Sequence, residues 1–304
     1  MQMQDKLIVE NLKTYYYSRS KVVPAVDGVS FTVDRGEVLG IVGESGCGKS
    51  TVVRSVLGLI DKSYTRIEEG RVLLNGQSLL DLSEKELNKI RGKAISMIFQ
   101  NPLSSLNPVY TVGSQIVEIL KIHENISKEE AKKRAVGLMR QVGIPAPESR
   151  FYDYPHQLSG GMQQRVGLAR ALTNDTDILL MDEAFSALDP LIRKEMQDEL
   201  LDLQSTMRKT ILFITHDLDE ALKIGDRIAL MKDGEIVQIG TPEDIMTNPA
   251  NDYVEKFVDD VDRSKVFSAQ HVMQHPETID VDKHGPRVAL QRMKQAGISS
   301  IYVV

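Results

Sequence analysis

Residues 43–51 are Gly43-Glu44-Ser45-Gly46-Cys47-Gly48-Lys49-Ser50-Thr51, and this stretch decides how the rest of the chain is interpreted. The residues before it, Val38–Val42, are apolar and predict a buried strand, and those after it, Val52–Leu57, predict the first turns of a helix. A glycine-rich turn between a strand and a helix N-terminus points backbone N–H groups and the helix dipole at an anion. The sequence therefore predicts a phosphate-binding loop here.

The residue types within this loop match the parts of a bound triphosphate. Its glycines let the backbone approach the phosphates: Gly43, Gly46 and Gly48. We expect the Lys49 ammonium to reach the β and γ oxygens and the Ser50 hydroxyl to suit Mg²⁺. The alternative is a chance match in a flexible loop, and the flanking strand and helix argue against it. All nine residues are assigned to a nucleotide site.

Composition restricts the class of protein. The chain has 304 residues, enough for a core and more than one domain, and its net charge of −6 offers no basic field for nucleic acid. No apolar stretch approaches the roughly 20 residues of a membrane helix, and Met1–Lys6 lacks a signal-peptide pattern. Cys47 is the single cysteine, which excludes an internal disulfide and a cysteine metal cage. We expect a cytosolic chain that meets a membrane only through a partner.

The hydrophobic pattern predicts an α/β protein with an inserted helical segment. Short β-like runs alternate with turns over residues 6–42. Apolar residues then recur at helical spacing in 112–124 and 128–142, which predicts two amphipathic helices. Beyond residue 160 a helix over 161–172 and an apolar strand over 177–181 are expected, the strand in the middle of a parallel sheet.

Polar residues at predicted strand ends supply the remaining chemistry. Asp182 can hold Mg²⁺ through water, and Glu183 can polarise the attacking water. His216 is placed to contact the γ-phosphate, and Gln100 can bridge Mg²⁺ and water. Each has a plainer alternative: a helix cap for the acidic pair, a cap of the helix beginning at Asp217 for the histidine, and an ordinary surface position for the glutamine.

A second glycine-containing stretch opens a helix at Leu158-Ser159-Gly160-Gly161-Met162-Gln163-Gln164-Arg165. It predicts another anion site, without a lysine of its own. In order along the chain, these stretches resemble the motifs of ATP-binding cassette (ABC) ATPases. Those motifs are the Walker A loop at 43–50, the Q-loop at Gln100, the signature at 158–165, the end of Walker B at 181–183, the D-loop at Ser186-Ala187-Leu188-Asp189 and the switch histidine at His216.

This resemblance covers residues 1 to about 240 and implies the fold class. That class is a P-loop NTPase of the ABC ATPase type, with an N-terminal antiparallel β subdomain and an inserted helical subdomain at about 102–160. It also implies ATP and Mg²⁺ as cofactors, with Ser50, Gln100 and Asp182 at the metal. The catalytic set is Lys49, Gln100, Glu183 and His216.

The resemblance further implies that two such subunits join head to tail. Each ATP then lies between Lys49 and Ser50 of one chain and the signature of the other, made of Ser159, Gly160, Gly161 and Gln163, with Asp189 in the D-loop. The family stacks an aromatic side chain on adenine, and we favour Tyr16 among Tyr15–Tyr17. The expected partners are permease subunits, a second ATPase subunit that is identical or homologous and, indirectly, an extracytoplasmic substrate-binding protein, at the cytoplasmic face of the membrane.

The two halves of the sequence resemble different importers. Residues 42–48 and 99–108 resemble dipeptide and oligopeptide importers, whereas 181–190 and 248–254 resemble glycine betaine/proline importers. Because the inserted helices and the Q-loop dock the permease in this family, di- or oligopeptide uptake is the leading prediction and glycine betaine/proline uptake the alternative.

The C-terminal part is predicted to be separate. Residues 241–265 are expected to form a helical linker, and 266–304 resemble the first half of a cystathionine-β-synthase-type (CBS) regulatory domain. A truncated chain or an artificial joining of two subunits is a further interpretation. Two rival classes are a soluble non-transport ABC ATPase and a nucleotide sensor without turnover. The absence of tandem cassettes argues against the first, and intact Lys49, Glu183 and His216 argue against the second.

Overall fold

The computed structural model describes residues 7–100, 106–174, 176–186, 188–259 and 261, together with 278–279, 288, 293 and 302–303. The chain divides into two compact units, Met1–Val261 and Asp262–Val304.

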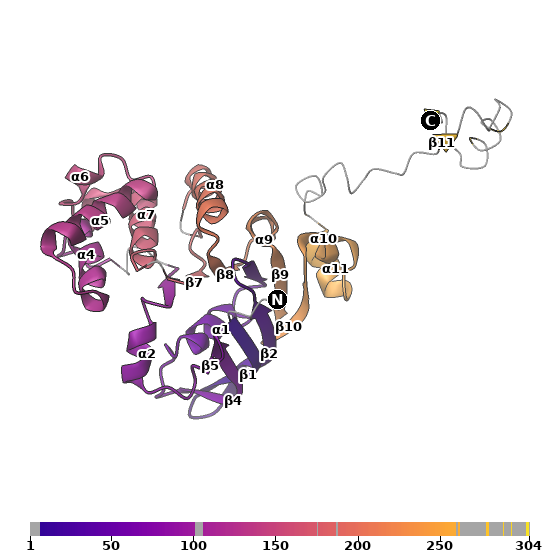
Figure 1. Ribbon diagram of the computed structural model, residues 1–304. Helices are drawn as coiled ribbons and strands as arrows, with labels where there is room; N and C mark the ends of the chain where they lie inside the picture. The colour runs from indigo at the N-terminus through magenta and orange to yellow at the C-terminus, as the bar shows by residue number, and fades with distance from the viewer. Residues whose placement is uncertain are drawn as a thin grey trace. The chain divides into compact units, whose positions relative to one another are not determined.

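The strands of the first unit are β1 (Leu7–Tyr17), β2 (Val22–Val33), β3 (Val38–Val42), β4 (Thr65–Leu74), β5 (Gln77–Ser78), β6 (Ile95–Ile98), β7 (Ile178–Asp182), β8 (Thr210–Thr215), β9 (Arg227–Lys232) and β10 (Glu235–Gly240). Its helices are α1 (Lys49–Val56), α2 (Glu84–Ile90), α4 (Val112–His123), α5 (Lys128–Gln141), α6 (Pro147–Arg150), the 3-10 helix η1 (Pro155–Gln157), α7 (Gly160–Ala171), α8 (Pro190–Met207), α9 (Leu218–Ile224), α10 (Pro242–Thr247) and α11 (Asp252–Val258). Figure 1 shows their arrangement.

The central sheet has the strand order β10-β9-β3-β8-β7-β6. Strands β9, β3, β8, β7 and β6 run parallel, and β10 joins β9 as an antiparallel hairpin. Every residue of β3, β7 and β8 is buried, as expected where helices cover both faces. In a parallel sheet the carboxyl ends of neighbouring strands meet at one edge. The loops after β3, β6, β7 and β8 therefore lie along that edge.

A second, antiparallel sheet has the order β2-β1-β4-β5. Helix α1 contributes Val52 and Val53 to the same hydrophobic core as Leu12 of this sheet and Leu212 of the central sheet. Within this core the hydroxyls of Thr14 and Ser55 share a buried hydrogen bond of 2.9 Å. Packing on both sheets fixes α1, and with it the loop that precedes the helix. The predicted antiparallel β subdomain is confirmed as part of the fold class.

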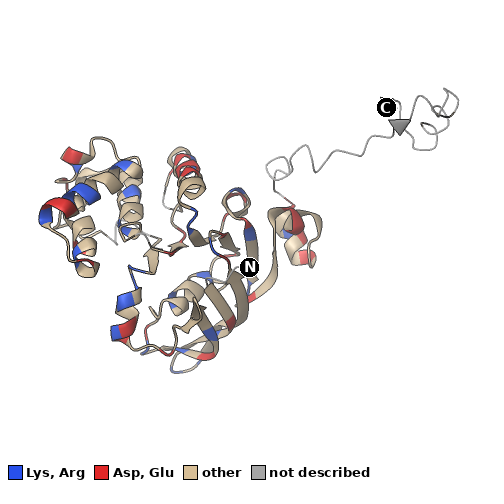
Figure 2. Ribbon diagram, in the orientation of Figure 1, with Lys and Arg blue, Asp and Glu red and all other residues tan. Residues whose placement is uncertain are grey.

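Helices α4, α5 and α7 form a subdomain with its own core. Ile116, Leu120, Ala131, Ala135 and Val142 are buried there, on the predicted helix faces. Helices α4 and α5 each end one residue before the predicted end, and α7 begins at Gly160 rather than 161 because Ser159 is its N-cap. Figure 2 shows basic and acidic residues interspersed along α5.

Helices α10 and α11 follow β10 and belong to the first compact unit. Ile245 and Val254 are fully buried, and Val258 nearly so. The expected helical linker over 241–265 thus contains two packed helices. In the second unit β11 (Thr278–Ile279) pairs in parallel with β12 (Tyr302–Val303). Most of the predicted CBS-like segment lies outside the described residues. Among the described residues, no helix combines the length and apolar character needed to cross a membrane.

Candidate active site

The loop between β3 and α1 has the shape that a phosphate site needs. Gly48, the N-cap of α1, has a φ of 106°, and no described side chain caps the helix. A Cβ on Gly48 would lie 2.0 Å from the Ala25 carbonyl oxygen, and one on Gly43 would lie 2.1 Å from that of Met231. Only glycine fits at these two positions. The amide groups at the start of α1 are therefore left for an anion.

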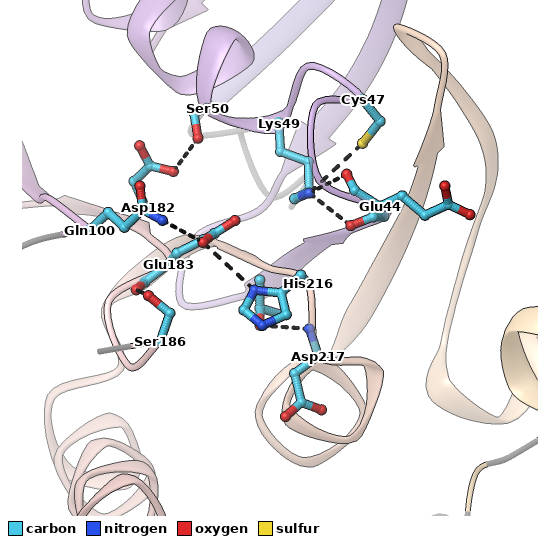
Figure 3. Close-up of polar contacts among 12 residues, drawn as sticks. Glu44, Cys47, Lys49, Ser50, Gln100, Asp182, Glu183, Ser186, His216 and Asp217 are labelled. Carbon is cyan, nitrogen blue, oxygen red and sulfur yellow. Dashed lines mark hydrogen bonds and ion pairs between the residues drawn. The ribbon is translucent and has the colours of Figure 1, made fainter. Parts of the chain in front are cut away.

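Lys49 lies inside the loop. Its side chain is 4% exposed, and Nζ donates hydrogen bonds to the carbonyl oxygens of Gly43 at 2.7 Å and Glu44 at 2.8 Å (Figure 3). These carbonyls satisfy the ammonium group within the loop. A phosphate oxygen can replace them, since a charge-assisted hydrogen bond to phosphate is stronger than one to a neutral carbonyl.

Ser50 and Asp182 meet across the sheet edge. The Ser50 hydroxyl donates to Asp182 Oδ1 at 2.6 Å, and the Arg54 guanidinium lies 4.0 Å from Oδ2. Oδ2 is buried without a hydrogen-bond partner among the described residues. Burial raises the pKa of Asp182, and the Ser50 hydrogen bond and the Arg54 charge offset part of that shift. A hydroxyl beside a carboxylate with an unsatisfied oxygen suits Mg²⁺.

Glu183 follows Asp182 and receives two groups from other loops. Gln100 Nε2 donates to Glu183 Oε2 at 2.7 Å, and His216 Nδ1 lies 3.6 Å from the same oxygen (Figure 3). Glu183 has a φ of 45°, a left-handed conformation that costs on the order of 1 kcal/mol for such a residue. Its amide donates to the Ile214 carbonyl at 2.9 Å, which holds this turn against β8. The sheet edge thus brings Gln100, Glu183 and His216 together.

The alternative that His216 caps α9 is wrong. The N-cap of α9 is Asp217, whose side chain accepts from the Glu220 amide, whereas His216 is half-exposed and turned toward Glu183. The acidic pair is not a helix cap either, because α8 is capped by Asp189, which accepts from the Ile192 amide. Ala187 of the predicted D-loop lies outside the described residues.

A cavity of about 610 Å³ lies over the loop. Its lining is Tyr16, Val23, Pro24, Ala25, Ser45, Gly46, Gly48, Lys49, Ser50, Thr51, Gln100, Glu183, Asp233 and Gly234. The Tyr16 hydroxyl shares a hydrogen bond of 3.0 Å with Thr51 Oγ1, and its ring stacks on Tyr64 at 6.0 Å between centroids. The predicted Tyr16 therefore forms part of the wall of this cavity.

Two side chains of the predicted nucleotide loop turn away from the cavity. Cys47 is 8% exposed, and burial raises the pKa of its thiol, while Lys49 offsets part of the shift. Glu44 is exposed and does not line the cavity. The Cys47 side chain is therefore packed under the loop.

Sequence reasoning missed several residues of this site. Arg54 stands one helical turn after Ser50 on α1, and that spacing could have indicated it. Asp233 and Gly234, in the turn of the β9–β10 hairpin, border the cavity only because of the tertiary fold. No signal in the local sequence placed them there.

The signature stretch lies apart from this cavity. Ser159 caps α7, and its hydroxyl accepts from the Met162 amide at 3.4 Å. Ser159 and Gly160 are exposed and Gly161 is half-buried. Among the described residues none of the cavity lining belongs to 158–165.

Gln163 requires a correction within that stretch. Its side chain is 4% exposed and donates to the carbonyl oxygens of Pro155 at 2.8 Å and Leu158 at 3.0 Å. The amide therefore holds the loop before α7 from inside. The predicted contact with nucleotide would need an exposed side chain beside Ser159, whereas the Gln163 side chain is buried.

A second cavity, of about 750 Å³, lies between the helical subdomain and the central sheet. Its lining includes Leu59, Phe99, Ile119, Ile122 and Arg170, and it also reaches Gln100 and Asp182. Phe99 and Ile122 are exposed. Gln100 thus borders both cavities.

A protein-family model described as "ABC transporter" matches residues 26–186, more than half of the chain. The chain belongs to the ABC transporter family. The predicted ABC ATPase resemblance and fold class are confirmed, and so is the prediction of an ATPase.

Some curated relatives of this ABC ATPase are named for glycine betaine transport and others for oligopeptide transport. This chain is 52% identical to the "Glycine betaine/carnitine transport ATP-binding protein GbuA" of Listeria monocytogenes, over 96% of this chain and 71% of the relative. Identity is 55% to the "Glycine betaine transport ATP-binding protein OpuAA" of Bacillus subtilis, over 92% and 64%. It is 45% to the "Oligopeptide transport ATP-binding protein OppD" of B. subtilis, over 81% and 69%. The chain thus spans about two thirds of the length of these relatives.

Solved structures match as well. One titled as the dimeric, post-hydrolysis state of the ATP-binding cassette MJ0796, bound to ADP and Pi, is 32% identical with a TM-score of 0.69. The match covers 78% of this ABC ATPase and 98% of that chain.

Proposed function

We propose that this chain is the ATP-hydrolysing subunit of an ABC importer for glycine betaine or a related osmoprotectant. In this proposal two ATPase subunits, identical or homologous, pair around ATP beneath partner permeases at the cytoplasmic face of the membrane. A substrate-binding protein on the other side delivers the solute.

One observation carries the catalytic part of the proposal. The phosphate loop, Gln100 and Glu183 line the same cavity, and His216 approaches the Glu183 carboxylate from the next strand end. We assign the backbone of Gly46–Thr51 and Lys49 to the phosphates, and Tyr16 to the adenine. Glu183 is assigned to orient and deprotonate the attacking water, and His216 to contact the γ-phosphate.

The metal site of the proposal comprises Ser50, Gln100 and Asp182. The unsatisfied buried Oδ2 of Asp182 beside the Ser50 hydroxyl supports it. A bound Mg²⁺ would neutralise charge on the transferring phosphoryl group. Among the described residues no three His, Cys, Asp or Glu side chains gather into a metal cluster. Mg²⁺ held by one carboxylate, a hydroxyl and substrate phosphates needs no such cluster.

Pairing of two chains would complete the site. Ser159 and Gly160 are exposed at the N-terminus of α7, and the described lining of the nucleotide cavity draws nothing from their stretch. We therefore assign Ser159, Gly160 and Gly161 to the ATP held by a second subunit, with Asp189 at the same interface. The MJ0796 structure, which is described as dimeric, supports the pairing.

The second cavity is proposed to receive the permease. Gln100 borders this cavity and donates to Glu183, so a permease segment seated there would act on the carboxylate through one side chain. Its apolar rim, with exposed Phe99 and Ile122, suits a helix of the permease.

The assignment of glycine betaine replaces the leading prediction of peptides. Relatives named for glycine betaine are 52% and 55% identical over 96% and 92% of the chain, against 45% over 81% for the oligopeptide relative. The resemblance of residues 181–190 and 248–254 to osmoprotectant importers agrees with this order.

Reconstitution into proteoliposomes tests the assignment. The chain is combined in turn with a glycine betaine permease and an oligopeptide permease, each with its binding protein, and phosphate release is followed with and without solute. We expect stimulation only with the first pair and glycine betaine, and none with Glu183→Gln. Stimulation only by peptide with the second pair would overturn the solute class while leaving the ATPase intact.

A further inference from the structure

Tyr253 of α11 lies against the end of β9, next to the turn that supports the phosphate loop. The Lys232 ammonium stands over the Tyr253 ring, 4.4 Å from its centroid. The Tyr253 hydroxyl is buried. Burial is the first cause of its raised pKa, the charges of Glu44, Cys47 and Asp233 add to the shift, and the Glu44 backbone offsets part of it. Because Lys232 is the last residue of β9, the ring lies beside the β9–β10 turn.

The β9–β10 turn itself supports the loop from the same side. The Gly234 amide donates to the Cys47 carbonyl at 3.1 Å, and Gly234 in turn accepts from the Asp27 amide at 2.8 Å. The Met231 carbonyl lies so close to Gly43 that no side chain fits between them. Residues 43–47 are therefore held by this turn, which Tyr253 of α11 approaches through Lys232, whereas the cavity lies over Ser45–Gly46 and Gly48–Thr51.

The position of the loop backbone determines how well its amides meet phosphate, because small displacements weaken such contacts steeply. We infer that Tyr253 is a positioning residue for the phosphate loop, its ring bracing the β9–β10 turn that holds residues 43–47 from outside the cavity. This inference rests on the proposed ATP site. Tyr253 touches no reacting atom and acts through the loop. It would also make α11, the last helix before the second unit, part of the support of the nucleotide site.

Cys47 provides a reporter that does not depend on nucleotide. It is the single cysteine of the chain and is 8% exposed under the loop. In Tyr253→Ala of the full chain, the loop should open more often, and we expect Cys47 to react with 5,5′-dithiobis(2-nitrobenzoate) at least about tenfold faster. Phe257→Ala is the matched control, since Phe257 lies one turn further along α11 with its ring 5.7 Å from that of Tyr253. It should leave the rate within about twofold.

Nucleotide affinity is the second readout. Equilibrium titration with MgATP should show a Kd raised about five- to thirtyfold in Tyr253→Ala, with kcat at saturating ATP within about twofold of the parent. Tyr253→Phe keeps the ring and should restore both the Kd and the thiol rate. The inference is overturned if Tyr253→Ala matches the parent in both readouts, if Phe257→Ala shows the same changes, or if Tyr253→Phe is as impaired as Tyr253→Ala.

The two readouts separate this inference from the proposed function. If the parent and Lys49→Ala both fail to bind MgATP, the ATP site is wrong, and the thiol rates still decide whether Tyr253 braces the loop. If Tyr253→Ala does not fold, Tyr253→Leu takes its place. It fills much of the same apolar volume without a flat ring, and unchanged thiol rate and Kd in that variant would refute the brace.

Discussion

Two helix N-termini of this chain, those of α1 and α7, have glycine backbones suited to anions but different surroundings. At α1 the amides lie at the edge of a buried sheet, with Lys49 inside the loop and Asp182 and Glu183 beside it. At α7 the exposed Ser159 caps its own helix, and the buried Gln163 holds the preceding loop from inside. The first site is built to bind a triphosphate by itself. In the proposed pairing, the second adds contacts to a phosphate that another subunit holds.

The physical difference is the connection to the central sheet. Strands β3, β7 and β8 end at one edge, so their loops converge and supply a cation, carboxylates and a histidine. Helix α7 begins in the helical subdomain, after the short helix η1, and no strand end leads into it. Four predictions break or sharpen this comparison.

Glu183→Gln should have the largest effect. Losing the carboxylate that orients and deprotonates water should lower kcat by about 10²- to 10⁴-fold, while the Kd for ATP stays within about threefold. Phosphate release and equilibrium binding measure the two quantities. Turnover near that of the parent would remove Glu183 from its role. Glu195→Gln, at an exposed position of α8, is the control, and it should retain most of the activity.

Lys49→Ala tests the site at α1 directly. The charge-assisted contact with phosphate disappears, and the Kd for ATP should rise on the order of 10- to 100-fold. Titration with a fluorescent ATP analogue measures it. Lys62, exposed in the loop after α1, provides the control Lys62→Ala, which should bind like the parent.

Ser159→Ala and Gln163→Ala distinguish the role of the exposed Ser159 at the start of α7 from that of the buried Gln163. In a Glu183→Gln background, Ser159→Ala should weaken ATP-dependent pairing about three- to tenfold, the value of one hydrogen bond. Gln163→Ala should instead lower the Tm, because two buried carbonyls lose their donor. Sedimentation with and without ATP and thermal unfolding distinguish them. Stronger loss of pairing in Gln163→Ala, at an unchanged Tm, would reverse the assignment.

The smallest expected change is in stability. Asp182→Asn should raise it slightly, although hydrolysis is lost. Burial raises the pKa of Asp182, so the folded chain holds a proton that the unfolded chain has lost, and stability falls as pH rises through this range. The neutral side-chain amide of the variant removes the cost of burying a charged carboxylate, a cost that applies at pH values above the folded-state pKa. The Tm at neutral pH should rise by about 2–4 °C, as for ~1 kcal/mol in a domain of this size, while hydrolysis with Mg²⁺ is lost. A lower Tm would contradict the unfavourable burial.

Much of the fold and site followed from local patterns. The buried strand Val38–Val42 and the glycines at 43, 46 and 48 predicted the loop. Strand β7 runs one residue further than predicted, to Asp182, because the hydrogen-bond ladder with β8 extends to Ile214. The predicted contact of Gln163 with nucleotide disagrees with its buried side chain, since residue type alone does not show which side of a helix start faces the protein.

The sequence by itself predicted a triphosphate-binding loop and a place among the ABC ATPases, because glycine spacing and helix-terminal amides act within a few residues. The tertiary structure decided which side chains share one carboxylate oxygen, that Cys47 lies under the loop, and that Tyr253 of α11 contacts Lys232 beside the turn that supports the loop. These are contacts between segments far apart in the chain. They depend on the strand order of the sheet and on the packing of the C-terminal helices, which no local pattern specifies.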